Sequence, residues 1–165
     1  GGHAGLYGSG LIGYIVVNVL LYITVGIEEE LMFRSVVTEC VLRKNSNIIV
    51  FASVYSGLLF GLAHITNFIF DADMTMFNKW CTMIMACVFG FTLAVIFLRT
   101  KSIGAIITLH FLWDFADFMN HMMIVERYRY GGSYNALVLQ IPVLIVMLVI
   151  AVFCMYKRQM RLQSV

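Results

Sequence analysis

Three consecutive glutamates and one arginine interrupt a long apolar stretch near the start of the chain. The segment 26–34 reads GIEEELMFR and follows residues 11–25, which carry no charge. An ionised carboxylate in such surroundings costs several kcal/mol unless it is paired, hydrated or neutralised. In a helix Arg34 stands four residues after Glu30 and can pair with it, whereas Glu29 points about 100° away around the axis. The spacing predicts one paired carboxylate and one, Glu29, that is available for chemistry; the alternative is a solvated helix end beside a membrane.

Other polar side chains lie inside apolar segments later in the chain. One is His64, and a second group, His110, Asp114, Asp117 and His121, recurs at spacings of 4, 3 and 4 residues. These spacings place the group on one stripe of a helix. Such a stripe must face the interior of a helical bundle or a water-filled cavity. Because Asp117 and His121 lie nearer a helix end, we expect them to be solvated or to cap the helix.

The composition excludes a soluble globular protein. The 165 residues are 61% hydrophobic and 12% charged, with a mean hydropathy of +0.90, whereas a soluble domain carries about twice that share of charge. The single proline and the long apolar segments indicate helical spans rather than the short strands of a membrane barrel. The net charge of +2 is too small to suggest nucleic-acid binding. The four cysteines show no CxxC or CxxH spacing, so we expect them to pack within helices.

The apolar segments predict a polytopic bundle of about five transmembrane helices, an all-α fold with its active site inside the membrane region. The expected helices cover residues 11–43, 48–67, 79–98, 103–125 and 134–156. The first would be roughly 50 Å long, more than a bilayer core, so we expect it to be tilted, to protrude or to break near Gly26.

We expect one membrane domain over residues 11–156, between a glycine-rich lead-in at 1–10 and a basic tail at 157–165. Since residue 1 is glycine, we also expect the chain to be part of something longer or a trimmed product.

Basic residues are distributed unevenly between the two ends of these helices. If each helix crosses once, only Lys79, Arg127 and Arg129 fall on one face. The opposite face receives Arg43, Lys44, Arg99, Lys101, Lys157, Arg158 and Arg161. The positive-inside rule therefore predicts a multi-pass protein, of the cell membrane, with its C-terminus in the cytoplasm.

The polar groups are expected at overlapping depths. Counted from the cytoplasmic turns, Glu29 lies roughly 21 Å in, His64 roughly 25 Å, and His110 and Asp114 roughly 12 and 18 Å. We expect a carboxylate of Glu29 or Glu30 within about 8 Å of a His64 ring nitrogen, which leaves room for one water.

These residues resemble the CPBP family of intramembrane proteases, which includes the CAAX prenyl endopeptidases and the bacterial bacteriocin-immunity (Abi) proteins. The family motifs EExxxR, FxxxH and HxxxN or HxxxD correspond to Glu29-Glu30 with Arg34, Phe60 with His64, and His110 with Asp114. The resemblance covers about residues 26–121. Two positions depart from the pattern: Ser35 stands where the family commonly has Gly, and Asp114 where many members have Asn.

The resemblance implies an endopeptidase that cleaves a peptide or a membrane-associated protein. The implied site consists of Glu29, His64, His110 and Asp114, supported by Glu30 and Arg34. Glu29 would be the general base and His64 its partner in activating water. A neutral His110 could donate an N–H to the tetrahedral oxygen, which contributes about 3 to 4 kcal/mol in acyl-transfer enzymes. Asp114 would orient His110 if ionised and could itself donate only if protonated; both remain open at this point.

Two alternatives are kept. Glu29, His64, His110 and Asp114 also form a possible zinc ligand set, although no HExxH motif is present and each of three helices would have to place a ligand within about 2.0 to 2.2 Å of the metal. We expect no cofactor, with zinc as the alternative. The second alternative is a non-catalytic immunity or scaffold protein, because buried acids and histidines also build proton relays. In every case the lipid bilayer is an expected partner and nucleic acid is not.

Overall fold

The structure is a computed structural model that describes residues 3–38, 40, 49–70 and 75–128, with short stretches at 142, 145–149 and 152–153. Every regular element within these residues is a helix, so the predicted all-α fold is confirmed. In chain order the elements are α1 (His3–Glu30), the π-helix η1 (Leu31–Thr38), α3 (Ile49–Ala63), α4 (Thr66–Phe70), α5 (Met76–Thr100) and α6 (Ile103–Tyr128).

The first helix begins at His3 and runs through Gly26 without a break. Of the three expectations for this long helix, a break near Gly26 is therefore not observed, and residues 3–10 are helical as the first part of α1. Gly26 is buried because α6 passes beside it: a Cβ at this position would lie 3.7 Å from the Ile107 carbonyl oxygen.

The helical geometry changes at Leu31, where the α-helix α1 is followed by the π-helix η1 directly after the glutamates. A π-helix bonds each N–H to the carbonyl five residues earlier, is rare, and occurs often at functional sites.

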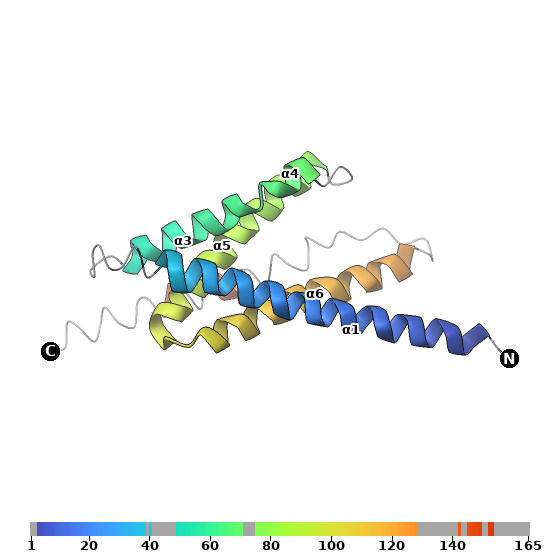
Figure 1. Ribbon diagram of the computed structural model, residues 1–165. Coiled ribbons are helices and arrows are strands. Elements are labelled where there is room, and N and C mark those ends of the chain that lie inside the picture. The colour runs from blue at the N-terminus through green and yellow to red at the C-terminus, as the bar shows by residue number, and fades with distance from the viewer. Residues whose placement is uncertain are drawn as a thin grey trace.

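Helices α3 and α5 form a closely packed pair (Figure 1). Gly57 and Gly61 of α3, four residues apart, face α5. A Cβ at Gly57 would lie 2.7 Å from the Cys87 carbonyl oxygen, and one at Gly61 would overlap the Cys87 sulfur. Small residues at this spacing let two helix backbones approach within a membrane. The predicted packing role of Cys87 is thereby confirmed, and Cys40, Cys81 and Cys87 form no disulfide.

The helix predicted at 48–67 is interrupted. Its α3 part ends at Ala63, His64 and Ile65 form a turn, and α4 follows. The turn bonds the His64 N–H to the Gly61 carbonyl at 3.1 Å, three residues back instead of four. His64 therefore lies at a helix end, where its side chain is not confined to one helical face.

Helices α1 and α6 form a second pair, which crosses the first near η1 (Figure 1). Tyr14 and Tyr22 of α1 contact Phe118 of α6, each with a ring centroid distance of 5.8 Å. At the crossing, η1 contacts α3, α5 and α6. The buried core lies here and includes Phe33, Phe60, Phe89, Leu93 and Ile106. The polar motif residues at the end of α1 are thus carried into the centre of the molecule.

Within the part of the chain that the structure describes, three helical stretches are long and apolar enough to cross a membrane: Gly10–Thr38, Val50–Phe70 and Met76–Thr100. Many of their large apolar side chains are exposed, as a lipid-facing surface requires; Leu20 is 59% and Phe51 55% exposed. The chain is an integral membrane protein. The predicted fifth helix lies largely, and the basic tail entirely, outside the described residues, so the cytoplasmic C-terminus stays a prediction.

Candidate active site

Glu30 and Arg34 form a fully buried ion pair. Arg34 Nε lies 3.0 Å from Glu30 Oε2, and both side chains are 0% exposed. The two atoms are not aligned for a hydrogen bond, so their contact is electrostatic. The guanidinium also donates from Nη2 to the Gly90 carbonyl of α5 at 3.2 Å and lies 4.7 Å above the Phe60 ring. The predicted pairing is confirmed, and the contacts with α5 and Phe60 are additional.

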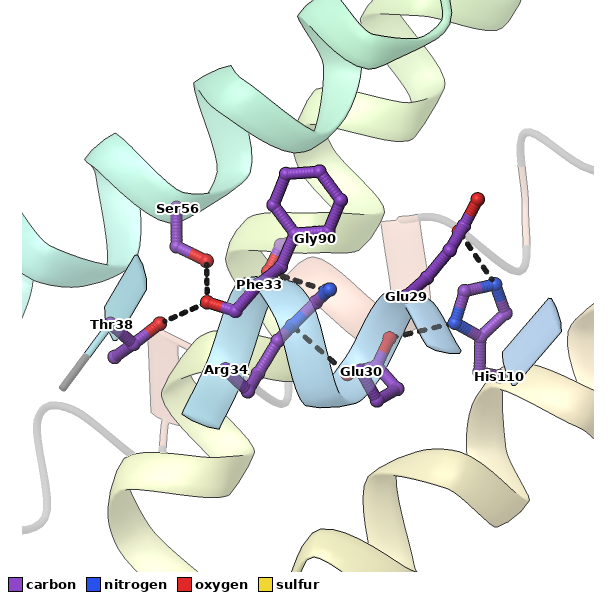
Figure 2. A network of polar contacts seen from close by, with 8 residues as sticks. All are labelled: Glu29, Glu30, Phe33, Arg34, Thr38, Ser56, Gly90 and His110. Carbon is purple, nitrogen blue, oxygen red and sulfur yellow. Dashed lines mark hydrogen bonds and ion pairs between the residues drawn. The ribbon is translucent and has the colours of Figure 1, made fainter. Parts of the chain in front are cut away.

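Glu30 also binds the imidazole of His110, so it lies between Arg34 and α6 (Figure 2). Glu30 Oε1 and His110 Nδ1 are 2.7 Å apart, and His110 is 3% exposed. An ionised carboxylate can only accept, so Nδ1 carries the proton and donates. A neutral His110 then presents a lone pair at Nε2, and only the imidazolium can donate from that atom.

This contact adds a partner that the sequence analysis did not name. With Nδ1 donating to Glu30, donation from Nε2 to an oxyanion requires the imidazolium form of His110. Asp114 approaches the ring at Nε2 instead, and its role in orienting His110 stays a prediction. The sequence could not reveal the contact with Glu30, because Glu30 and His110 are 80 residues apart.

The other nitrogen of His110 faces two more carboxylates. Its Nε2 lies 3.6 Å from Glu29 Oε2 and 3.6 Å from Asp114 Oδ2. These distances are just too long for direct hydrogen bonds, which leaves the polar atoms available to a water or a substrate group. The Glu29 side chain is 33% exposed against 0% for Glu30. The two neighbouring glutamates therefore differ as predicted: one is enclosed and paired, the other accessible.

A cavity of about 240 Å³ lies between α3, α5 and α6. Its polar lining consists of His64, Thr82, His110, Asp114 and Asp117, and its aromatic walls of Phe60, Phe89 and Trp113. Asp117 is exposed, in keeping with the expected solvated role, and it also lines this cavity, as its place on the same helical stripe as His110 and Asp114 predicts. The side chain of His121 lies outside the described ones.

His64 reaches the cavity from the end of α3. Its Nδ1 lies 3.0 Å from the Phe60 carbonyl, which can only accept, so Nδ1 donates and a neutral ring has its lone pair at Nε2. The Phe60 ring packs against both imidazoles, with centroids 5.2 Å from His64 and 5.7 Å from His110. Phe60 thus spaces the two histidines across the cavity. The predicted 8 Å approach of a glutamate to His64 stays a prediction.

Gly90 explains how Phe60 and Arg34 come so close to α5. A Cβ at Gly90 would lie 2.8 Å from the Phe60 Cβ, so any larger residue would push α3 away. The missing side chain also exposes the Gly90 carbonyl that accepts from Arg34. Sequence reasoning missed this residue, because a single glycine within an apolar helix carries no distinctive signal.

The family model for the Rce1-like type II CAAX prenyl endopeptidase matches residues 11–116, which is more than half of the 165-residue chain. The chain belongs to the Rce1-like CAAX prenyl endopeptidase family. The Rce1-like region includes the candidate site residues Glu29, Glu30, His64, His110 and Asp114. No curated protein and no solved structure matches the chain significantly. Membership of the Rce1-like family supports endopeptidase activity in the membrane, with a peptide or a membrane protein as substrate.

Proposed function

We propose that this protein hydrolyses a peptide bond by a glutamate mechanism, with Glu29 as the general base. The observation that carries the proposal is the position of His110 Nε2, which lies 3.6 Å from both Glu29 and Asp114 on a ring that also lines the cavity. Glu29 of α1 thus approaches the same nitrogen as Asp114 of α6, and His110 and Asp114 line the cavity together with His64. Such a group of titratable side chains at a cavity is the arrangement that hydrolysis requires.

The proposed steps use only the side chains present. Glu29 takes a proton from a water, the resulting hydroxide adds to the substrate carbonyl carbon, and the C–N bond breaks as Glu29 returns the proton to the leaving amine. His64 accepts a hydrogen bond from the attacking water at Nε2. His110, as an imidazolium balanced by Glu30, faces the developing oxyanion. Asp114 lies beside the same nitrogen and helps to retain the charged ring.

The substrate that we propose is a peptide or membrane-associated protein processed near its C-terminus, as the name of the family suggests. A prenylated and a non-prenylated version of one fluorogenic peptide would determine whether the lipid is required. A protein that turns over neither, and whose cellular effect survives Glu29→Gln, would instead have the non-catalytic immunity or scaffold role.

A zinc mechanism does not fit the side chains as they are placed. Among the residues that the structure describes, no three His, Cys, Asp or Glu side chains could hold a metal ion together. The Nδ1 atoms of His64 and His110 are engaged by the Phe60 carbonyl and by Glu30, so each ring could offer a metal only its Nε2 atom. The set of Glu29, His64, His110 and Asp114 would have to rearrange before it could bind zinc at about 2.0 to 2.2 Å.

Treatment with a chelator distinguishes the glutamate mechanism from a zinc mechanism. Peptide turnover by the purified protein in detergent should stay within about twofold of the untreated rate after prolonged treatment with a strong chelator, because no step passes through a metal. A covalent carboxylate-directed reagent should abolish the same turnover. Loss of activity on chelation, followed by recovery on addition of zinc, would contradict the glutamate mechanism.

A further inference from the structure

The main-chain carbonyl of Phe33, within η1, accepts two side-chain hydroxyl groups (Figure 2). Thr38 Oγ1 donates to it at 2.9 Å from the same helix, and Ser56 Oγ donates at 3.2 Å from α3. Both donors are 0% exposed. We refer to Thr38 and Ser56 together as the hydroxyl pair. Thr38 is the last residue of η1 and Ser56 belongs to α3, and the hydrogen bond of each hydroxyl goes to the Phe33 carbonyl and not to a group proposed to react.

The bond from Thr38 differs from those of other threonines in this chain. Thr38 reaches the carbonyl five residues earlier, the partner that π geometry supplies. The corresponding bonds in the α-helices reach four residues back, at Thr24, Thr92, Thr100 and Thr108. In an α-helix Thr38 would point at the Arg34 carbonyl instead. Its hydroxyl is therefore satisfied by the π form of this segment.

The π-helix joins two stretches that are held by different neighbours. Before it, α1 is fixed against α6 by Gly26 and by the contact of Glu30 with His110. Within it, η1 is fixed against α3 and α5, through Ser56 and through the bond from Arg34 to Gly90. A slip of one residue toward α geometry would shift one stretch by about 1.5 Å and 100° relative to the other. Glu30 precedes η1 and contacts His110 of α6, whereas Arg34 lies within η1 and contacts Gly90 of α5, so the slip would prevent both contacts from being kept at once.

We propose that Thr38 and Ser56 are positioning residues, which hold η1 in π geometry and thereby keep Arg34, Glu30 and His110 in register. The inference rests on the proposed function, because it is the reaction that needs this register. Ser56 ties the register to α3, the helix that also carries Phe60 and ends at His64. The hydroxyl pair thus couples the placement of the glutamates to that of the histidine across the cavity.

Two substitutions remove the pair with little change of volume, and the chain offers matched controls. Thr38→Val combined with Ser56→Ala removes both hydroxyls, whereas Thr38→Ser keeps a hydroxyl at position 38 and leaves Ser56 unchanged. Thr92→Val is the control, because Thr92 is also 0% exposed and donates at 2.9 Å to its own helix, but within α5 and to Val88. We expect the double variant to lower kcat by about 10-fold to 100-fold with KM within about twofold, because misplaced groups slow the chemical step. Thr92→Val and Thr38→Ser should retain at least about half of the wild-type kcat by the same reasoning.

Amide hydrogen exchange on the same variants, in the same detergent, tests the conformational part without relying on activity. Residues 31–38 should exchange at least about 10-fold faster in the double variant than in Thr92→Val, because η1 loses two of its restraints. Unchanged exchange in this segment, or a kcat equal to that of Thr92→Val, would overturn the proposal. If wild-type turnover proved independent of Glu29, the proposed function would fail, whereas the exchange result would still decide whether the hydroxyl pair holds η1.

Discussion

His110→Asn is expected to lower peptide turnover by roughly 100-fold to 1000-fold while the protein still folds. Asparagine places its side-chain nitrogen the same number of bonds from the main chain as Nδ1, so it can still donate to Glu30. It has no counterpart of Nε2, the atom that lies 3.6 Å from Glu29 and Asp114. The substitution therefore removes the atom proposed to face the oxyanion and preserves the buried contact.

The comparison with His110→Leu distinguishes the contribution of Nδ1 from that of Nε2. Leucine removes both, so the buried Glu30 carboxylate loses one of its partners, and we expect less folded protein as well as no turnover. The measurements are kcat and KM of the purified variants, together with their melting temperatures in detergent. Near wild-type kcat in His110→Asn would show that Nε2 has no part in the reaction.

Arg34→Met should destabilise the protein by about 3 to 5 kcal/mol, because it leaves the Glu30 carboxylate buried without its cationic partner. Both side chains are 0% exposed, so water cannot replace the guanidinium unless the core opens. The effect should appear as a lower yield of folded protein and a lower melting temperature. An Arg34→Met protein that melts like the wild type would show that the ion pair contributes nothing to stability.

The double variant Glu30→Gln with Arg34→Met is the control for this effect. Removing both charges together avoids an unpaired buried ion, and such replacements are often neutral. We expect the double variant to recover most of the lost stability but not the activity, since a neutral glutamine does not balance an imidazolium at His110. Recovery of both would limit the role of Glu30 to stability alone.

Much of the fold follows from the sequence, because membrane helices are specified by length and composition. The predicted spans at 79–98 and 103–125 lie within α5 and α6, and each falls within a few residues of the observed ends. The pairing of Glu30 with Arg34 could also be predicted from the sequence, since it depends on a spacing of four residues within one helix. Local spacing and hydrophobicity suffice for features of this kind.

The remaining features depend on contacts between distant segments. The π geometry of η1 is associated with the bond from Ser56 and with the docking of Arg34 on Gly90, neither of which is visible in residues 31–38 themselves. The orientation of His110 by Glu30 likewise requires that α1 and α6 lie side by side. The sequence predicted that Glu29, His110 and Asp114 lie close together, but not which carboxylate contacts which nitrogen, and the donor role of His110 stays a prediction.

The two glutamates illustrate how one motif supplies two functions. Glu30 is fully buried and contacts both Arg34 and His110, so it holds these two side chains in position. Glu29 is one residue earlier, partly exposed, and faces His110 Nε2 at a distance that leaves room for another polar group. Adjacent positions on a helix point about 100° apart, which is what allows neighbours to occupy such different environments.

The most direct test of the glutamate mechanism compares Glu29→Gln with Glu28→Gln. The two variants make the same chemical change one residue apart, and Glu28 is exposed and lies outside the site. Turnover of a fluorogenic peptide by purified protein should fall at least about 100-fold in Glu29→Gln, because an amide cannot take the proton from water. In Glu28→Gln it should stay within about twofold of the wild type by the same reasoning. Equal turnover in the two variants would contradict the assignment of Glu29 as the general base.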